Sequence, residues 1–236
     1  MQIAAVPCAD LRIAFVSANL NNFDSAQPLL EQDFSDWPEV GSLYHHVFTD
    51  EDFPPRKNAL HPRLQQQICK MFSWQLLPGY DYYMWMDSSC AVATPKTVGY
   101  FYDLCTSTQS DFVFFHHPQR RSIKEEANYL RVKLAEGNKY LTPRYAGEFL
   151  DGLEQEVFSD PTFKDTRLYA STTFMYKNTK KTQKALKEWW YFSSRYHALD
   201  QLALPFVLWK MACRVAPIRE NYLKSSLLTY TRNKKR

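Results

Sequence analysis

The segment that decides the fold is YDYYMWMDSSCAV, residues 80–92. Its apolar and aromatic run lies between Pro78-Gly79 and Asp87. A short, uninterrupted run of this kind predicts a strand buried on both faces. Such strands are typical of mostly parallel α/β sheets. Ligands of open α/β sheets bind beyond the carboxyl ends of the strands. We therefore expect Asp87 to face a ligand or a metal ion.

Hydrophobic patterns on either side of this strand predict the rest of an α/β domain. Apolar runs indicate four further strands, at 11–18, 44–49, 111–116 and 168–176. Apolar residues at helical spacing indicate helices at about 62–74, 95–106, 123–135, 179–194 and from about 203. Ser122 and Glu125 form the S-x-x-E pattern of a capping box. These elements predict a central, mostly parallel sheet flanked by helices.

The composition fits a globular domain with an unusual share of aromatic residues. Hydrophobic residues make up 45% and charged residues 23%, both ordinary values. The aromatic share of 16% is high. Aromatic rings stack on sugar faces and bases, although they also fill cores. Four of the excess positive charges lie in the last five residues, RNKKR, and the remaining 25 basic residues balance 25 acidic ones. The chain therefore has no predicted nucleic-acid surface.

Cysteine usage and hydropathy predict a soluble, cytoplasmic protein. The five cysteines are scattered and lack C-x-x-C spacing, which favours a reducing compartment over structural zinc. No apolar run approaches the ~20 residues that span a bilayer. The first residues lack an apolar segment long enough for a signal peptide.

Asp87 and Ser89 are the candidate metal ligands. Mg²⁺ and Mn²⁺ prefer hard oxygen ligands, usually one or two carboxylates together with phosphates. A D-x-D motif would supply a second carboxylate, but Ser89 stands at that position. A metal would then need a further ligand from His117, His197 or water. The alternative is that Asp87 caps the turn that follows the strand.

Polar residues at the ends of the first two strands are candidate donor contacts. Ser17 and Asn19 could hydrogen-bond a nucleobase or ribose. Acids at 50–52 could bind donor hydroxyls, and arginine holds phosphate through two parallel hydrogen bonds. The basic residues nearby are Arg56, Lys57 and Arg63. A polar surface loop explains the same composition.

Two later motifs complete the candidates. Arg120 precedes a predicted helix N-terminus, where backbone N–H groups could help to hold an anion. His117 follows a strand and could bind a metal or a phosphate. Asp200-Gln201 stands before the last predicted helix, where we expect both side chains to be exposed. Asp200 is either a general base for an acceptor hydroxyl or a helix N-cap.

Taken together, these segments resemble a known family of glycosyltransferase-like proteins. It was formerly a domain of unknown function and includes plant mucilage and pollen-tube turgor proteins with bacterial and viral relatives. The chain is also similar to compact glycosyltransferases encoded by algal viruses. The matching pieces follow the family's order: FTD at 48–50, PR at 62–63 with Lys70, YDYYMWMDSS at 80–89, HPQRRSIKEEA at 117–127 and LDQLALPFVLW at 199–209.

The resemblance implies the GT-A fold, a Rossmann-like nucleotide-diphospho-sugar transferase. We expect a single domain over 1–236, with a nucleotide-sugar half at about 11–110, an acceptor half at about 111–215 and a basic tail at 231–236. The implied donor is a nucleotide sugar of the UDP type. The implied acceptor is a glycan or other hydroxyl compound, and the implied cofactor is Mn²⁺ or Mg²⁺.

The resemblance also implies roles for individual residues. Asp87 would be the metal or diphosphate acid, Asp50 a donor-site residue, and Asp200 with Gln201 the late active-site motif, while Ser88-Ser89 departs from the D-x-D pattern. His117, Arg120 and Glu126 would contact the donor sugar or phosphate. Together with the candidates named above, the donor-binding set comprises Ser17, Asn19, Asp50, Arg56, Lys57, Arg63, Lys70, His117, Arg120 and Glu126. Asp200 would deprotonate the acceptor in an inverting reaction or position it in a retaining one.

Two other functions fit the same pattern. One is a relative that binds a nucleotide sugar without transferring it. The other is a different metal-dependent α/β enzyme that acts on phosphate groups.

Overall fold

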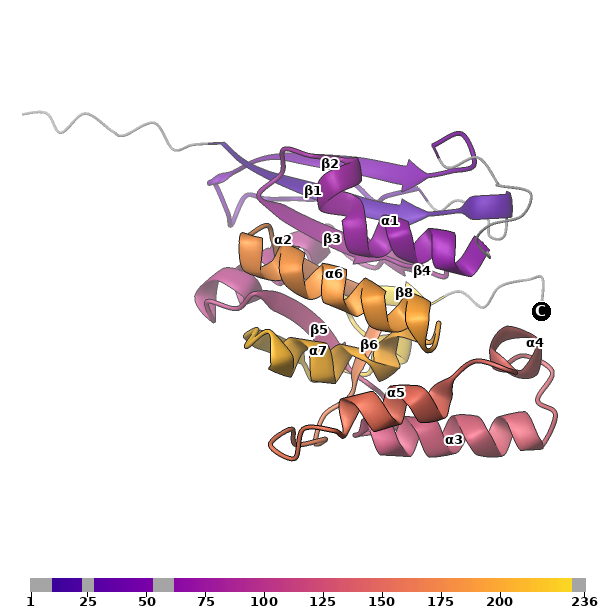
Figure 1. Cartoon of the computed structure of the whole chain (residues 1–236). Helices are drawn as coiled ribbons and strands as arrows, with labels where there is room; N and C mark the ends of the chain where they lie inside the picture. The colour runs from indigo at the N-terminus through magenta and orange to yellow at the C-terminus, as the bar shows by residue number, and fades with distance from the viewer. Residues whose placement is uncertain (1–9, 23–27, 53–61, 231–236) are drawn as a thin grey trace, which may run out of the picture.

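A mixed six-stranded sheet organises the part of the chain that the structure describes, residues 10–22, 28–52 and 62–230 (Figure 1). In this computed structural model the strands are β1 (Leu11–Ala18), β2 (Val40–Phe48), β3 (Tyr82–Met86), β4 (Cys90–Val92), β5 (Phe112–His116), β6 (Tyr169–Lys177), β7 (Val215–Ile218) and β8 (Leu228–Tyr230). The helices are α1 (Pro62–Leu76), α2 (Thr97–Ser107), α3 (Ile123–Ala135), α4 (Thr142–Tyr145), α5 (Leu150–Val157), α6 (Lys180–Arg195) and α7 (Leu204–Lys210).

The main sheet has the strand order β2-β1-β3-β6-β5-β7, and β4 pairs with β8 in a separate small sheet. β1 pairs in parallel with β2 and β3, and β5 pairs in parallel with β7. β6 is antiparallel to both of its neighbours, β3 and β5. Within the described part of the sheet, β6 is thus the one reversed strand, and the predicted mostly parallel α/β sheet is confirmed.

β3 lies in the interior of this sheet, as its sequence predicts. All five of its residues are buried. Tyr83, Met84 and Trp85 have no exposed surface. Because side chains alternate between the two faces of a strand, Tyr83 and Trp85 enter one core cluster while Met84 enters the other. An uninterrupted apolar run is the pattern expected where both faces are covered.

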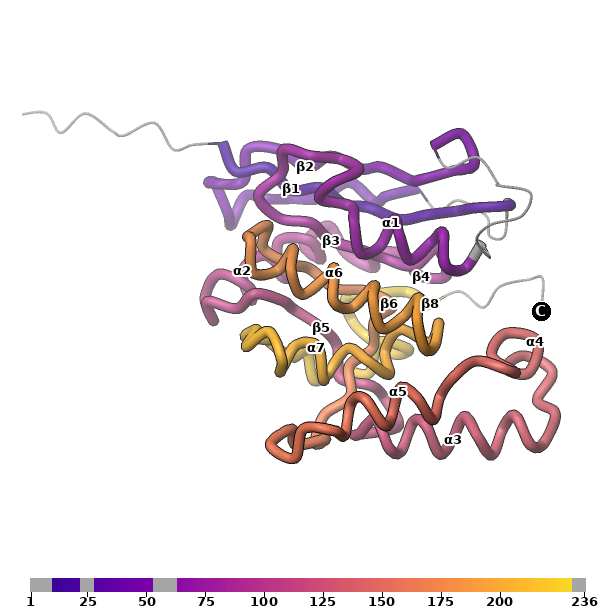
Figure 2. Tube along the Cα trace, in the orientation of Figure 1, coloured from indigo at the N-terminus to yellow at the C-terminus, as the bar shows by residue number. Residues whose placement is uncertain are grey.

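Helices cover one face of the sheet, and α2 with the small sheet covers the other. The first core contains residues of α1, α3, α5, α6 and α7. The second contains residues of α2, β4 and β8. Figure 2 shows α3 and α5 side by side, and Arg131 of α3 forms ion pairs with Asp151 and Glu154 of α5.

The predicted elements differ from the observed ones mainly where the sequence signal is weak. α3 has the predicted bounds, and Ser122 accepts a hydrogen bond from the Glu125 N–H, as the capping motif predicts. β2 begins four residues earlier than expected, at Val40, because Gly41 and Ser42 mask the strand pattern. β7 was not predicted because it contains Pro217, which is tolerated on an edge strand. α5, β4 and β8 were also not predicted, and each is short.

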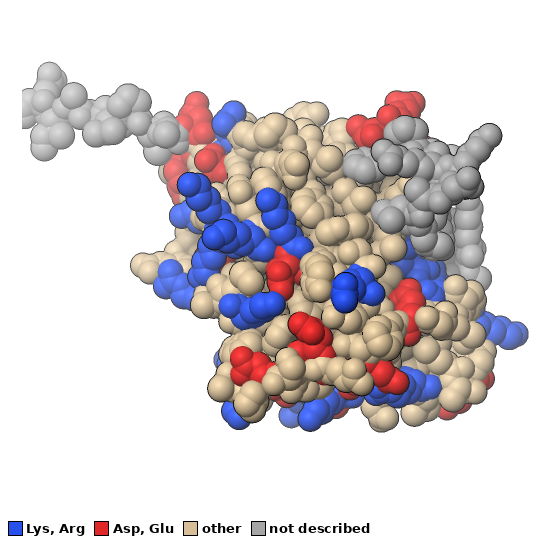
Figure 3. Space-filling view, in the orientation of Figure 1, with Lys and Arg blue, Asp and Glu red and all other residues tan. Residues whose placement is uncertain are grey.

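The surface carries mixed charge, with basic side chains gathered over the start of α6. The lysines of this helix are Lys180, Lys181, Lys184 and Lys187. Figure 3 shows Lys and Arg side chains gathered at the left of the face, with acidic residues interspersed below them. The opposite side of the helix buries Leu186 and Trp189. This is the pattern of an amphipathic surface helix.

No helix within residues 10–22, 28–52 and 62–230 is both long and apolar enough to cross a bilayer. The cysteines in the same ranges, Cys69, Cys90, Cys105 and Cys213, are free thiols.

Gly99 of α2 packs closely against Trp37, in the segment that precedes β2. A Cβ atom added at Gly99 would lie 2.1 Å from a ring carbon of Trp37. We expect Gly99→Ala to lower the free energy of unfolding by about 1–3 kcal/mol, because overpacking outweighs the helix preference of alanine. Urea denaturation measures the change. Gly99→Ala with Trp37→Leu should recover part of the loss, and a single variant as stable as the wild type would contradict this packing argument.

Candidate functional site

A pocket of about 420 Å³ opens at the edge of the main sheet where β1 and β3 end. Its wall includes Ala18 at the end of β1 and Asp87 directly after β3. Because β6 runs in the opposite direction, the start of β6 reaches the same edge with Ser171 and Thr172. The Asp87 N–H donates to the Thr172 carbonyl at 2.8 Å. The pocket therefore lies where α/β sheets bind ligands.

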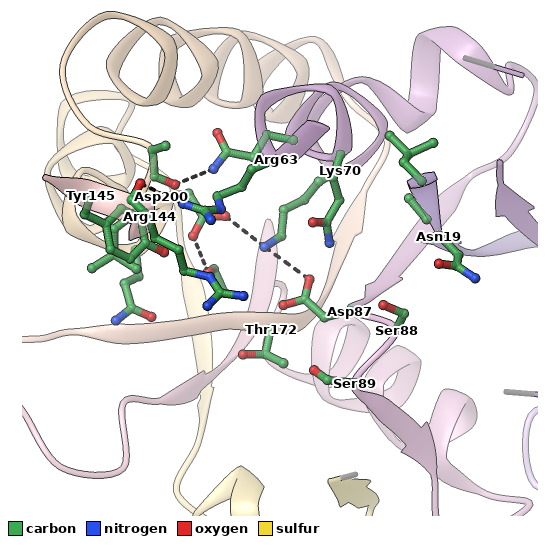
Figure 4. Close-up of a pocket in the computed structure, with 18 of the residues that line it drawn as sticks. Asn19, Arg63, Lys70, Asp87, Ser88, Ser89, Arg144, Tyr145, Thr172 and Asp200 are labelled. Atoms are coloured by element: carbon green, nitrogen blue, oxygen red, sulfur yellow. Dashed lines mark hydrogen bonds and ion pairs between the residues drawn. The ribbon is translucent and has the colours of Figure 1, made fainter. Parts of the chain in front are cut away.

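Lys70 of α1 lies between two carboxylates at the centre of this pocket (Figure 4). Its Nζ is 2.8 Å from Asp200 Oδ2 and 3.5 Å from Asp87 Oδ1. Lys70 and Asp200 are buried, whereas Asp87 keeps 28% of its side chain exposed. The three residues come from α1, from the end of β3 and from the segment before α7. We refer to them as the Asp–Lys–Asp cluster.

Each member of the Asp–Lys–Asp cluster is held by a further hydrogen bond or ring contact. Trp85 Nε1 donates to Asp87 Oδ1 at 2.8 Å. Ser171 Oγ donates to Asp200 Oδ1 at 2.7 Å. Lys70 Nζ lies 5.7 Å from the centroid of the Trp85 ring and 6.0 Å from that of Trp189, within the range of a cation–π contact.

The charges of the cluster shift the pKa values of Lys70 and Asp87. Burial by itself favours the neutral amine of Lys70, but the attraction of Asp200 and Asp87 outweighs it, so the pKa of Lys70 is raised. Burial raises the pKa of Asp87 in spite of the attraction of Lys70, and repulsion from Asp200 adds to the rise. Lys70 is therefore a buried ammonium at neutral pH.

The prediction that Asp200 is exposed is wrong. Asp200 keeps only 7% of its surface because it lies in a short 3₁₀ turn, Asp200–Leu202, that packs under the sheet edge. Trp189 Nε1 of α6 donates to the Asp200 carbonyl at 2.8 Å. Gln201 also lines the pocket and is half-buried. The helix that follows begins at Leu204, close to the predicted start.

The side of the pocket formed by the start of α1 and by α4 carries two arginines and two tyrosines. Arg63 Nη1 donates to the Arg144 carbonyl at 2.9 Å, and its guanidinium lies 5.0 Å from the Tyr145 ring centroid. The Arg144 guanidinium lies 3.6 Å from the Tyr140 ring centroid. Arg63 was among the predicted donor-binding residues. Arg144, Tyr140 and Tyr145 were not, because only a weak helix signal at Pro143 marks their segment.

The end of β1 brings two predicted residues to the site. Asn19 lines the pocket, together with Ser88 and Ser89 after β3. Ser17 lines a small adjoining recess, which shares Asn19, Asp87 and Ser88 with the main pocket. The predicted nucleotide-contact residues are therefore close to Asp87.

Several other predicted donor-binding residues lie elsewhere. Both carboxylate oxygens of Asp50 accept a hydrogen bond from the Asn21 N–H, at 3.1 and 3.0 Å, and Asp50 does not line the pocket. Arg56 and Lys57 lie outside the described residues.

His117, Arg120 and Glu126 form a group beside the pocket wall. The Nε of Arg120 forms an ion pair with the Glu126 carboxylate. The backbone N–H of Arg120 donates a hydrogen bond to His117 Nδ1 at 3.0 Å. Glu126 in turn accepts from Gln201 Nε2 at 2.9 Å. The three side chains are not among the pocket-lining residues, so the structure connects them to the site through Gln201.

The predicted anion position at the start of α3 is filled by the chain's own carboxylate. The backbone N–H groups of Ile123 and Lys124 donate to Asp165 at 2.7 and 3.0 Å. A helix N-terminus favours a negative charge, and Asp165 supplies it. The prediction of a ligand anion there is therefore wrong.

The donor set of the pocket does not fit a divalent metal well. Asp87 Oδ1 accepts from Trp85 and faces Lys70, and both oxygens of Asp200 are engaged by Lys70 and Ser171. Neither His117 nor His197, the predicted further ligands, lines the pocket. No group of three His, Cys, Asp or Glu side chains in the described ranges is arranged to hold a metal. Binding of Mn²⁺ or Mg²⁺ therefore stays a prediction from the sequence, and the contacts of Asp87 and Asp200 do not favour it.

The fold is the α/β arrangement of GT-A proteins, as predicted. The apo structure of the WbbM bifunctional glycosyltransferase matches 91% of this chain with a TM-score of 0.50 at 12% sequence identity, and the chain spans 40% of its length. A glycosyltransferase involved in glycosylation of the major capsid of PBCV-1 matches 90% of this chain and 84% of its own, with a TM-score of 0.45 at 12% identity.

Neither a protein-family model nor a curated protein sequence matches the chain. At this identity the structural likeness shows the fold alone. Membership of the plant, bacterial and viral family stays a prediction.

His197 is buried beside the segment that carries Asp200. Its ring stacks on Tyr145 with the centroids 5.2 Å apart, and its Nδ1 accepts from the Leu199 N–H at 3.1 Å. Its Nε2 has no hydrogen-bond partner among the described residues. Burial lowers the pKa of His197 to about 4, so the ring is neutral at neutral pH.

Acidification from pH 6.5 to 4 should destabilise the fold through His197. The unfolded ring takes up a proton near pH 6.5, whereas the folded ring does so only at about pH 4. The unfolded state therefore binds more protons in this window, and the free energy of unfolding falls as the pH falls. The two pKa values set an upper limit of about 3 kcal/mol for the loss.

Urea denaturation at several pH values tests this dependence. His197→Gln should flatten the fall in unfolding free energy between pH 6.5 and 4. Burial also lowers the pKa of His117 to about 4, so His117→Gln is a second variant if the first does not fold. Curves that run parallel to the wild type for both variants would contradict the assignment.

Proposed function

We propose that the chain transfers a sugar from a nucleotide-diphosphate donor, of the UDP type, to a hydroxyl group of a glycan or other acceptor. The observation that carries the proposal is the Asp–Lys–Asp cluster in a pocket at the carboxyl edge of a GT-A-type sheet. A pocket of about 420 Å³ suits a small organic ligand. The fold shared with a bifunctional glycosyltransferase supports the same assignment.

In this proposal the nucleoside occupies the side of the pocket formed by the end of β1. Asn19 and the adjoining recess with Ser17 offer polar groups to the base or ribose. The diphosphate lies toward Arg63 and Arg144, since guanidinium groups bind phosphate oxygens in pairs. The sugar then lies near Asp200 and Gln201.

The aromatic lining fits a carbohydrate ligand. Four tyrosines, Tyr140, Tyr145, Tyr222 and Tyr230, are among the residues that line the pocket. Tyrosine offers an apolar ring face to a sugar and a hydroxyl to its polar groups. The high aromatic content of the sequence thus contributes to the pocket as well as to the core.

The transfer requires that the bond between the anomeric carbon and the phosphate oxygen break, with the electron pair remaining on the phosphate. The acceptor oxygen forms the new bond to that carbon, and its proton passes to water or to the departing phosphate. Both oxygens of Asp200 already accept hydrogen bonds from Lys70 and Ser171. A carboxylate has about four acceptor positions, so Asp200 keeps positions for a sugar hydroxyl, and we assign it to orienting the sugar.

Asp200→Asn should lower the rate of nucleoside diphosphate release from a nucleotide sugar by about 100-fold, a loss that misplacement of an active-site group by about 1 Å can cause. The shape of the side chain is kept, but its charge and its pairing with Lys70 are lost. The measurement is UDP release over a panel of UDP-sugars, with and without glycan acceptors. The matched control is Asp151→Asn, an exposed residue of α5, which should keep the wild-type rate.

Other outcomes separate the alternatives. Release of inorganic phosphate in place of UDP would favour the phosphate-handling enzyme. Donor binding without product from any acceptor would favour a binding protein. Equal rates for Asp200→Asn and the wild type would remove Asp200 from the mechanism.

A further inference from the structure

The charged residues that line the pocket give it a positive balance. Arg63, Lys70 and Arg144 carry three positive charges, and Asp87 and Asp200 are the two lining carboxylates among the described residues. Both arginines are anchored by contacts on the same side of the pocket, through the Arg144 carbonyl and the rings of Tyr140 and Tyr145. A guanidinium stacked on a ring still presents its N–H groups along its edge. Both arginines line the pocket, where such an edge can donate to a ligand.

Lys70 occupies the space between Asp87 and Asp200. A divalent metal ion would lie in this space if both acids were its ligands. Its Nζ pairs with Asp200 at 2.8 Å and approaches Asp87 at 3.5 Å. A divalent ion bound to Asp87 would lie beside this ammonium, and two like charges in a partly desolvated pocket repel strongly. Ser89, the third residue of the strand-end motif, offers only a hydroxyl.

The remaining hydrogen-bonding capacity of Lys70 suits an anion. An ammonium has three N–H donors, and the ion pairs with Asp200 and Asp87 use two directions. Because Lys70 lines the pocket, we expect the third donor to serve a phosphate oxygen or a sugar hydroxyl there. Because Lys70 is buried and its position is fixed by two carboxylates and two indole rings, little reorganisation is needed when the anion binds.

We propose that this site binds a nucleoside diphosphate without a divalent cation, with Lys70, Arg63 and Arg144 supplying the counter-charge that a metal would otherwise provide. The proposal rests on the function assigned above. It replaces the divalent metal predicted from the sequence by positive groups of the chain itself. It also explains why Ser89 is compatible with the site, since no second strand-end carboxylate is needed.

Calorimetric titration of the full chain with UDP tests the proposal. One buffer contains EDTA and the other contains MnCl₂. The proposal predicts UDP dissociation constants that agree within about threefold in the two buffers, and weaker binding as salt is added because charged contacts are screened. Lys70→Met should weaken binding at least about tenfold in EDTA, as expected when a desolvated charge contact to an anion is lost.

Matched variants separate the pocket from general effects of charge. Lys184→Met removes an exposed lysine of α6 and should bind UDP as the wild type does. If Lys70→Met does not fold, Arg144→Gln should likewise weaken UDP binding at least about tenfold in EDTA, because Arg144 is half-buried and lies outside the core. Its control is Arg195→Gln, a change at an exposed residue that should leave UDP binding unaltered.

Each outcome decides between the two proposals. UDP binding that requires Mn²⁺, or that tightens more than about threefold with it, would overturn the metal-free site and leave the glycosyltransferase assignment standing. Binding in EDTA without transfer from any UDP-sugar would overturn the transferase and keep the metal-free site. Absence of UDP binding in both buffers would overturn both.

Discussion

A buried ammonium between two carboxylates is the interaction on which the rest of the site depends. Removing Lys70 from water is costly, and the ion pairs with Asp200 and Asp87 offset that cost. If one partner of such a group is removed, the unpaired charge typically costs about 3–5 kcal/mol. Since the three residues come from α1, the end of β3 and the turn before α7, the cluster joins segments that are distant in the sequence. The cluster contains two carboxyl groups and one ammonium, so the positive balance of the pocket lining comes from Arg63 and Arg144.

The reversed strand β6 gives this cluster its surroundings. Because β6 begins at the edge where β1 and β3 end, Ser171 can donate to Asp200, and the Thr172 carbonyl can accept from the Asp87 N–H. Two helices hold the segment before α7 in place: Gln67 of α1 donates to the Ala198 carbonyl, and Trp189 of α6 donates to that of Asp200. The site is thus supported by the sheet below and by helices beside it, and a preorganised site of this kind pays little to reorganise on binding.

Much of the fold could be predicted because strong local patterns coincide with burial. The runs that became β1, β3 and β5 are largely apolar, and β6 combines β-branched and aromatic residues around Ser171. All four strands lie inside the sheet. β7 was not predicted because Pro217 interrupts the hydrophobic pattern of a strand, although an edge strand tolerates proline. Within the site, Asp87, Asn19, Arg63 and Lys70 were predicted and line the pocket, whereas Arg144 and the four tyrosines were not distinguished from ordinary surface and core residues.

The sequence by itself determined that the chain forms an α/β sheet with an acid at the end of its central strand, because hydrophobic periodicity and strand-end position are local properties. Only the tertiary structure decided that Asp200 is buried, that Lys70 lies between it and Asp87, and that Asp165 fills the start of α3. These facts depend on contacts between residues that are far apart in the sequence: Lys70 and Asp200 are separated by 130 positions, and Ile123 and Asp165 by 42 positions. A pattern of neighbouring residues carries no information about which distant charge will neutralise a buried one, and in this protein that pairing sets the chemistry of the strand-end acid.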